Sequence, residues 1–276
     1  IMTGTPTSNG QLCNVWSQMA AITPTVRRGR VYPEAFGGMS YYEWLDRFAC
    51  LNKYRKPYKY RDVDAIQDVM SSLGYRITKD ECLDLPEKLP DEILHVGLAN
   101  AAAQPYRQMV ESSAIVELDT LAGNPLTRAL RLRQLASGFI ERDDGTRVEY
   151  QCPKIAALRE FLLDFEGKFV VFCDFRHSID AVAALLDRMR IPFAVLDGRS
   201  PDKGVWRDFQ EDAAIRGMVV QYASGSAGID LYAADTCIFF EPTLSSNLNE
   251  QAKDRIHRIG QKRACSYYYL IADGTI

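Results

Sequence analysis

The residue types best suited to chemistry lie close together near the C-terminal end of the chain. The segment Gln251-Ala-Lys-Asp-Arg255-Ile-His-Arg258-Ile-Gly-Gln261 carries an amide and two guanidiniums. On an α-helix, Gln251, Arg255 and Arg258 would fall within a sector of about 60°. Such a face can grip phosphate oxygens through planar, charge-assisted hydrogen bonds. The alternative is a basic helix face that is simply solvated. Asn247, with Glu250 three residues later, predicts that the helix starts just upstream.

A second segment combines positive charge with aromatic rings. Residues 53–61 read Lys-Tyr-Arg-Lys-Pro-Tyr-Lys-Tyr-Arg, in which five cations alternate with three tyrosines. The cations could follow a phosphate backbone while the rings pack against sugars. The alternative is a solvated loop whose tyrosines fold onto the core. We predict DNA contact by the five cations of this segment: Lys53, Arg55, Lys56, Lys59 and Arg61.

The composition indicates an intracellular globular protein. A chain of 276 residues that is 47% hydrophobic can bury more than one core. The seven cysteines are scattered and lack any C-x-x-C spacing, which argues against disulfides or a zinc site and for a reducing compartment. No membrane span or signal peptide is visible. The net charge of −3 means that any DNA contact must come from local patches.

The apolar pattern predicts an α/β fold in the C-terminal half. Continuous apolar strands alternate there with amphipathic helices, which favours a parallel sheet covered by helices on both faces. The N-terminal part is different, with a short helix that ends at Pro24 and then an irregular, mainly helical stretch over about 51–120. The strands are expected at 169–173, 193–196, 218–222, 237–240 and 267–271, and the helices between them near 155–165, 179–189, 203–211 and 247–257.

The opening residues supply a family resemblance when they are combined with the C-terminal segment. Residues 1–9 begin with apolar residues that lead into Thr3-Gly4-Thr5-Pro6, with Asn9 shortly after. Together with His257-Arg258-Ile-Gly-Gln261, this resembles helicase superfamily two, and specifically the Swi/Snf-type DNA translocases. Further segments match the family in the right order and extend the resemblance over nearly the whole chain: Leu85-Pro86, Leu132-Arg133-Gln134, Val171–Phe175 and Gly225–Leu231.

The resemblance implies a RecA-like second motor lobe and three regions. Residues 1–50 would be the C-terminal tail of the first lobe, 51–124 a helical protrusion, and 125–276 the second lobe. The family's phosphate loop and magnesium motif lie upstream of Thr-Gly-Thr-Pro, and neither occurs in this sequence. ATP and Mg²⁺ would therefore be bound mainly by a first lobe that is missing here, and the chain alone is expected to be inactive.

The resemblance also assigns residue roles. Arg255 and Arg258 would be arginine fingers that stabilise charge on the transferred phosphoryl group. Gln251, Gly228 and Asp230 would contact nucleotide. Ala223 stands where the family often has lysine, which weakens the expectation of a phosphate contact in this loop. The remaining assignments are motif-three coupling by Thr3, Gly4 and Thr5, and DNA contact by Arg176, His177, Ser224 and Gly225.

The implied function is that of an ATP-driven, DNA-stimulated translocase on double-stranded DNA. The spacing at Gly74–Lys79 resembles bacterial or phage members, so the expected setting is the cytoplasm of a bacterium or a phage-infected cell, and a nucleosome is not the expected substrate. Two alternatives stay open. One is a strand-separating or RNA-directed helicase of the superfamily, and the other is a non-catalytic DNA-binding module. The sequence leaves the oligomeric state undetermined.

Overall fold

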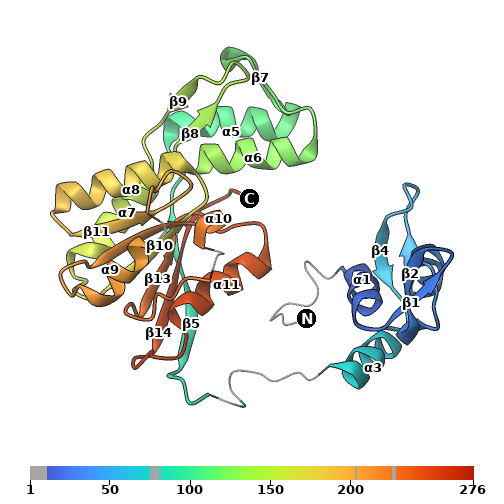
Figure 1. Cartoon of the computed structure of the whole chain (residues 1–276). Coiled ribbons are helices and arrows are strands. Elements are labelled where there is room, and N and C mark those ends of the chain that lie inside the picture. Colours follow the sequence, from blue (N-terminus) through green and yellow to red (C-terminus); the bar gives the residue numbers. More distant parts are fainter. Residues whose placement is uncertain (1–10, 75–80, 82, 203, 226–227) are drawn as a thin grey trace. The chain divides into compact units, whose positions relative to one another are not determined.

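The computed structural model describes residues 11–74, 81, 83–202, 204–225 and 228–276 (Figure 1). The chain divides into two compact units, 1–83 and 84–276, each with its own hydrophobic core. The N-terminal unit contains α1 (Cys13–Ile22), β1 (Pro24–Arg27), β2 (Arg30–Pro33), η1 (Glu34–Phe36), α2 (Tyr41–Phe48), β3 (Ala49–Leu51), β4 (Pro57–Tyr60) and α3 (Val63–Leu73).

The core of the N-terminal unit is aromatic. Helix α2 begins at a capping box, in which the side chains of Ser40 and Glu43 each accept a hydrogen bond from the other residue's backbone N–H. Trp44 and Phe48 lie on the buried face of this helix and pack against Phe36, with ring centroids 5.9 and 5.7 Å from that of Phe36. Two hairpins, β1–β2 and β3–β4, complete the unit.

The C-terminal unit is built on a six-stranded parallel sheet in the order β11-β12-β10-β13-β14-β5. Strand β10 lies near the middle and is buried at every residue, which explains its unbroken apolar sequence. The strands are β5 (Lys88–Val96), β10 (Phe169–Cys173), β11 (Phe193–Leu196), β12 (Gly217–Gln221), β13 (Thr236–Phe239) and β14 (Cys265–Ala272).

Helices cover both faces of this sheet, so the predicted RecA-like architecture is confirmed (Figure 1). Helices α7 and α8 pack on one face, where Leu158 and Val182 contact the sheet, and α9 and α11 pack on the other through Phe209 and Ile256. The helices are α7 (Pro153–Leu163), α8 (Arg176–Met189), α9 (Val205–Glu211), the short α10 (Tyr222–Gly225) and α11 (Ser246–Ile256).

The residues between β5 and α7 form a smaller group of helices and short strands. Its two helices, α5 (Asn100–Ser112) and α6 (Pro125–Ala136), pack together around Met109 and Leu135. Asn124 caps α6 by accepting a hydrogen bond from the backbone N–H of Thr127. The remaining elements are β6 (Ala114–Ile115), η2 (Val116–Leu118), β7 (Thr120–Leu121), β8 (Phe139–Glu141) and β9 (Arg147–Glu149).

The expectation of a mainly helical stretch over about 51–120 is wrong in part, because strands β4 and β5 lie within it. The chain forms compact units whose boundary in the sequence lies between Leu83 and Asp84, while the division into motor regions 1–50, 51–124 and 125–276 stays a prediction. Strand β4 pairs with β3 inside the N-terminal unit, while β5 joins the C-terminal sheet through β14. Strand β5 was missed because its first six residues are exposed, so it lacks the apolar alternation that marks a strand. Assignment of the N-terminal unit to the first motor lobe stays a prediction.

No helix within the described ranges is both long enough and apolar enough to cross a bilayer.

The separate cores lead to a prediction about stability. Replacing Trp44, which is 0% exposed, by Ala should destabilise the N-terminal unit by about 3–5 kcal/mol through lost contacts and a cavity. The C-terminal unit should keep its own unfolding transition, and calorimetry with tryptic probing of each unit would measure both. Tyr42→Ala on the same helix is the control, since Tyr42 is 66% exposed. A loss of stability shared equally by both units would contradict separate cores.

Candidate nucleotide and nucleic-acid site

Helix α11 carries the segment with the two guanidiniums, and its start differs from the prediction by two residues. The N-cap is Ser245, whose side chain accepts a hydrogen bond from the backbone N–H of Leu248 at 3.4 Å. Ser245 is thus the capping residue rather than Asn247. This cap places Gln251 and Arg255 on the same helix, as predicted.

The end of α11 corrects the expectation that all three polar side chains share one helix face. The helix ends at Ile256, so Arg258 lies in the turn that follows. The buried amide of Gln261 ends the helix, because its Nε2 lies 3.1 Å from the carbonyl oxygen of Ile256 and 2.7 Å from that of Ala234. Gly260 permits the return of the chain with a φ of +105°.

The turn nevertheless brings the two arginines together with a predicted nucleotide-binding residue. Nη1 of Arg258 lies 2.7 Å from Oδ1 of Asp230 and donates to the carbonyl oxygen of Ile229 at 3.2 Å. The backbone N–H of Leu231 donates to the carbonyl oxygen of Arg255 at 2.9 Å. Burial, and then the neighbouring Arg258 charge, lower the pKa of Arg255. Two guanidiniums whose charges affect one another favour an anion as ligand.

The loop before β13 supplies the other predicted nucleotide contacts. Gly228 is exposed and has a φ of +53°, a conformation that suits glycine. Asp230 forms an ion pair with Arg258, so its carboxylate holds the guanidinium of Arg258 in place. Gln251 is half-buried and lines a small hollow beside Tyr222 and Gly225. The predicted nucleotide-binding residues therefore all lie on α11 or the loop that contacts its end.

Packing accounts for Gly225 on this structure. A Cβ added there would lie 2.8 Å from Val220 and 3.1 Å from Phe172, so a larger residue would displace the core. Ser224 is half-buried on the same short helix. Of the two residues predicted to contact DNA, Gly225 is buried and Ser224 keeps part of its surface exposed, so the contact stays a prediction for Ser224.

Arg176 and His177 are the first two residues of α8, which begins three residues before the expected helix near 179–189, and only Arg176 is exposed. The ring of His177 packs 4.5 Å from the ring of Phe139, and its Nδ1 lies 3.5 Å from Glu149. Burial lowers the pKa of His177, with the Glu149 charge opposing this shift. Arg176 is therefore better suited than His177 to hold phosphate.

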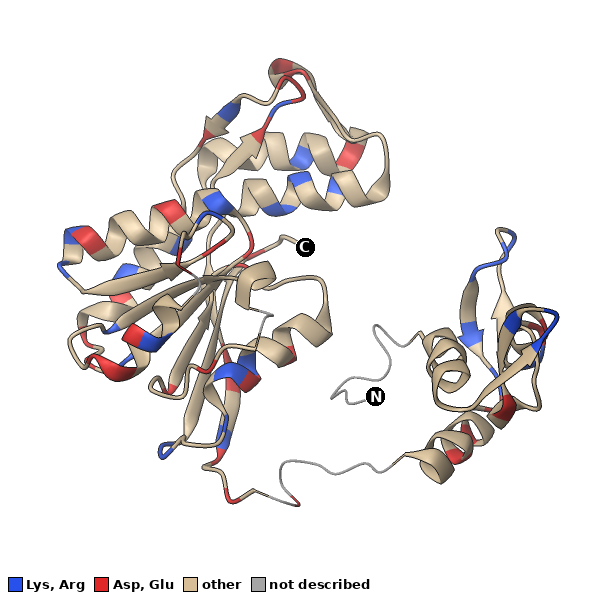
Figure 2. Cartoon of the chain, viewed as in Figure 1, with Lys and Arg blue, Asp and Glu red and all other residues tan. Residues whose placement is uncertain are grey.

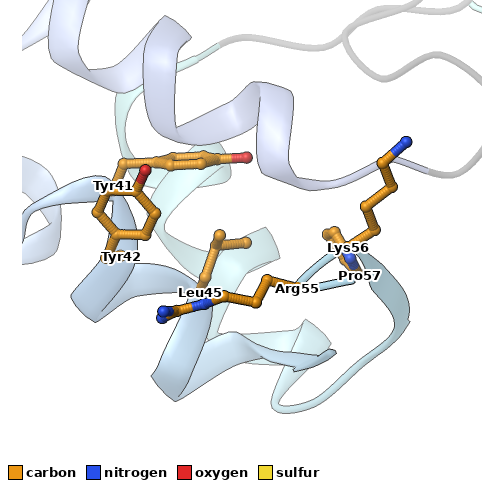
Figure 3. A pocket seen from close by; sticks show the side chains of 6 residues that line it. All are labelled: Tyr41, Tyr42, Leu45, Arg55, Lys56 and Pro57. Atoms are coloured by element: carbon orange, nitrogen blue, oxygen red, sulfur yellow. The ribbon is translucent and has the colours of Figure 1, made fainter. Parts of the chain in front are cut away.

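The five cations of the 53–61 segment are all exposed on the β3–β4 hairpin (Figure 2). Arg55 has a φ of +58° and lies over the ring of Tyr42, at 5.9 Å from its centroid. Tyr41, Tyr42 and Arg55 line a shallow hollow on the N-terminal unit (Figure 3). Arg61 is held by a hydrogen bond, because its Nη2 donates to the carbonyl oxygen of Ala49 at 2.7 Å. This surface can accept phosphates without disturbing the core.

Thr3, Gly4 and Thr5 lie outside the described residues. Magnesium has no evident ligand set in the ranges that the structure describes, since no group of three or more His, Cys, Asp or Glu side chains there could hold a metal ion. The described residues therefore provide no set of ligands for a metal ion.

A buried polar network at the carboxyl end of the sheet went unpredicted. Glu241, only 2% exposed, accepts a hydrogen bond from the backbone N–H of Asp174 at 2.9 Å and from the hydroxyl of Ser178. Lys154, 4% exposed, donates to the carbonyl oxygen of Phe240 at 2.9 Å. Burial raises the pKa of Glu241 and lowers that of Lys154, while each charge opposes the shift of the other. The sequence signal that could have indicated this network is Glu241, a charged residue that directly follows the apolar strand predicted at 237–240.

Arg133, from the Leu-Arg-Gln segment, joins α6 to the same edge. Its Nη2 lies 2.7 Å from Oδ2 of Asp174 and 3.1 Å from the carbonyl oxygen of Pro242. Its guanidinium also lies over the ring of Phe175. This segment therefore positions the loops after β10 and β13.

Comparisons with known proteins find helicases as relatives of this chain. Residues 153–260 match the family model described as helicase conserved C-terminal domain. Over its whole length the chain is 29% identical to a protein of Mycoplasma genitalium and 28% identical to one of Mycoplasma pneumoniae, both named uncharacterized ATP-dependent helicase. The alignments cover 100% of this chain and 26% of each relative, so the chain spans about a quarter of their length.

Two further similarities cover shorter parts of the chain. A SWI/SNF-related matrix-associated actin-dependent regulator of chromatin subfamily A-like protein 1 of Bos taurus is 33% identical over 129 residues, which are 44% of this chain and 14% of that protein. The solved structure of the C-terminal part of the Fun30 ATPase domain superposes with a TM-score of 0.55 at 17% identity, over 70% of this chain and 87% of that one. The latter likeness shows a shared fold.

The role of Gln261 in ending α11 can be tested. Replacing Gln261 by Ala should leave buried carbonyl oxygens without their donor and lower the free energy of unfolding of the C-terminal unit by about 1–3 kcal/mol. Urea titration would measure this loss. The neighbouring Lys262→Ala is the control, since Lys262 is exposed. An unchanged unfolding midpoint for Gln261→Ala would show that the turn holds without the amide.

Proposed function

Since this chain carries the C-terminal motor portion of a Swi/Snf-type helicase of superfamily two, we propose that it supplies the arginine fingers and part of the DNA grip of an ATP-dependent, DNA-stimulated translocase. The observation that carries the proposal is the pair Arg255 and Arg258 held together at the end of α11, with Asp230 at 2.7 Å from Arg258. Phosphoryl transfer needs positive charge on the departing γ-phosphate, and two positioned guanidiniums provide it.

The proposed chemistry divides between this chain and the first motor lobe. Magnesium, when bound, neutralises charge on the phosphates, and its ligands would come from that first lobe together with the phosphate loop. On this chain, Arg255 and Arg258 stabilise the developing charge, while Gln251, Gly228 and Asp230 contact or position the nucleotide. Residues 1–276 alone would accordingly show no ATP hydrolysis above a buffer blank.

The proposed nucleic-acid surface comprises local cations, in line with a net charge of −3. Arg176 and Ser224 would contact DNA on the C-terminal unit, and the β3–β4 hairpin would do so on the N-terminal unit. We propose double-stranded DNA as the substrate. The free state of the six described cysteines favours a reducing, cytoplasmic setting.

Two other functions can be separated from this one by experiment. An RNA-directed or strand-separating helicase would show RNA-stimulated ATP hydrolysis or release of an annealed strand, which a duplex translocase would lack. A non-catalytic DNA-binding module would bind duplex DNA but turn over no ATP even with its complete N-terminal lobe.

The arginine assignment predicts a large loss of turnover. In the complete protein, Arg255→Ala and Arg258→Ala should each reduce ATP turnover by roughly 10³-fold or more, because the fingers stabilise transition-state charge. Steady-state ATPase assays with saturating DNA would measure it, and DNA affinity should change little. Arg263→Ala is a matched control, since Arg263 pairs with Asp235 at 2.8 Å in the next stretch of chain. Turnover within about threefold of wild type for both arginine variants would refute the assignment.

The hairpin patch predicts a change in salt dependence. Replacing Lys53, Arg55, Lys56, Lys59 and Arg61 by Gln should weaken duplex binding and flatten its slope against log salt, since each phosphate contact contributes about 0.9 to that slope. Binding titrations across salt concentrations would measure both effects. ATP turnover without DNA should be unchanged.

The control variant for this prediction changes cations on helices α7 and α8 of the C-terminal unit. Arg159→Gln with Arg188→Gln removes exposed cations from α7 and α8. This variant should keep the wild-type slope. If the hairpin variant keeps that slope as well, its cations face solvent rather than DNA.

A further inference from the structure

A short stretch at the start of the C-terminal unit, residues 86–91, contacts the end of α11. The carbonyl oxygen of Pro86 lies 2.8 Å from Nε2 of His257, a side chain that is 3% exposed. Nζ of Lys88 lies 3.0 Å from Oδ1 of Asp254. These contacts join positions more than 160 residues apart in the sequence. The end of α11 is therefore fixed to chain that follows directly on the N-terminal unit.

The strongest of these contacts is between Lys253 and Asp91. Nζ of Lys253 lies 2.6 Å from Oδ2 of Asp91, and it lies 5.4 and 5.6 Å from the ring centroids of Tyr267 and Tyr269. Burial alone would lower the pKa of Lys253, but hydrogen bonds from its ammonium to Asp91, Tyr269 and Glu250 raise it above its usual value. Glu250 of the same helix also lies 3.2 Å from this ammonium, but Asp91 is the carboxylate partner that belongs to another element. A buried ammonium paired across two elements in this way fixes their register.

The arginine-bearing turn is thereby held from two sides. Arg255 directly follows Lys253 and Asp254, which contact residues 86–91. On the other side, residues 229–231 contact the backbone of Arg255 and the guanidinium of Arg258. A shift of either segment would move the guanidiniums.

We propose that residues 86–91, together with Lys253, Asp254 and His257, form a clamp that positions the arginines of the turn for catalysis. The clamp residues are positioning residues, because they act through the backbone of α11. The proposal rests on the proposed role of Arg255 and Arg258. It makes the placement of the arginines depend on chain outside the helicase conserved C-terminal domain match at 153–260.

The test compares two changes at one position in the complete protein. Asp91→Asn removes the carboxylate charge but keeps the side-chain shape, and Asp91→Glu restores the charge. Misplaced arginines should lower kcat about tenfold in Asp91→Asn while KM for ATP stays within about twofold. Asp91→Glu should recover at least about half of the wild-type kcat. A loss confined to packing would not separate kcat from KM, nor respond to the return of charge.

A second variant removes the other charge of the ion pair and preserves the packing of the side chain. Lys253→Met keeps an unbranched side chain against Tyr267 and Tyr269 but removes the ammonium, so the unit should stay folded while kcat falls as in Asp91→Asn. Asp180→Asn is the matched control, since Asp180 pairs with Arg199 at 2.7 Å elsewhere in the unit and should leave kcat unchanged.

The outcomes separate the clamp from the role of the arginines. If Arg255→Ala is inactive while Asp91→Asn and Lys253→Met both turn over ATP within about twofold of wild type, the clamp is refuted and the arginine fingers stand. If Arg255→Ala itself retains wild-type turnover, the proposed function fails, and the clamp fails with it. A fall in kcat for both clamp variants, with recovery in Asp91→Glu, supports the proposal.

Discussion

Every candidate site element of the C-terminal unit depends on the backbone pairing of β10. This strand is buried over its whole length and hydrogen-bonded to β12 on one side and β13 on the other. Because the strands are parallel, the segments that follow them emerge at one edge of the sheet. Asp174, Tyr222 and Phe240 come directly after β10, β12 and β13. The apolar sheet thus fixes the loops, and the loops in turn hold α11.

Charge at that edge is neutralised inside the fold rather than displayed. Lys154 and Glu241 are both almost fully buried, and their side chains bond backbone groups at the ends of β13 and β10. Arg133 pairs with Asp174. Removing the charge of Lys154 or of Glu241 would leave the other charge buried without compensation, which typically costs several kcal/mol. The exposed cations of the β3–β4 hairpin differ, since none of them forms an ion pair with a described residue, and their charges are available to a polyanion.

The sequence predicts a strand well where both faces of it are buried, as at 169–173, because an unbroken apolar run has few alternatives. It fails at β5, whose polar residues carry no such signal and whose partner β14 lies more than 160 residues away. The motif residues Arg255 and Arg258 could be found from type and spacing alone. Their geometry could not, because the end of α11 is set by Gln261 and by residues 229–231, which are distant contacts.

The position of β5 at the edge of the sheet bears on how this protein can be divided for study. A truncated chain that starts near residue 125, where the second lobe was predicted to begin, would lack β5 and leave without partners the backbone N–H and C=O groups of β14 that pair with β5, although β14 would still pair with β13. An eight-residue strand that contains three consecutive tyrosines followed by Leu270 and Ile271 is, with an open edge, a template for intermolecular pairing. A cut just before Asp84 keeps that edge covered by the nine-residue strand β5 and is the natural place to separate the two units.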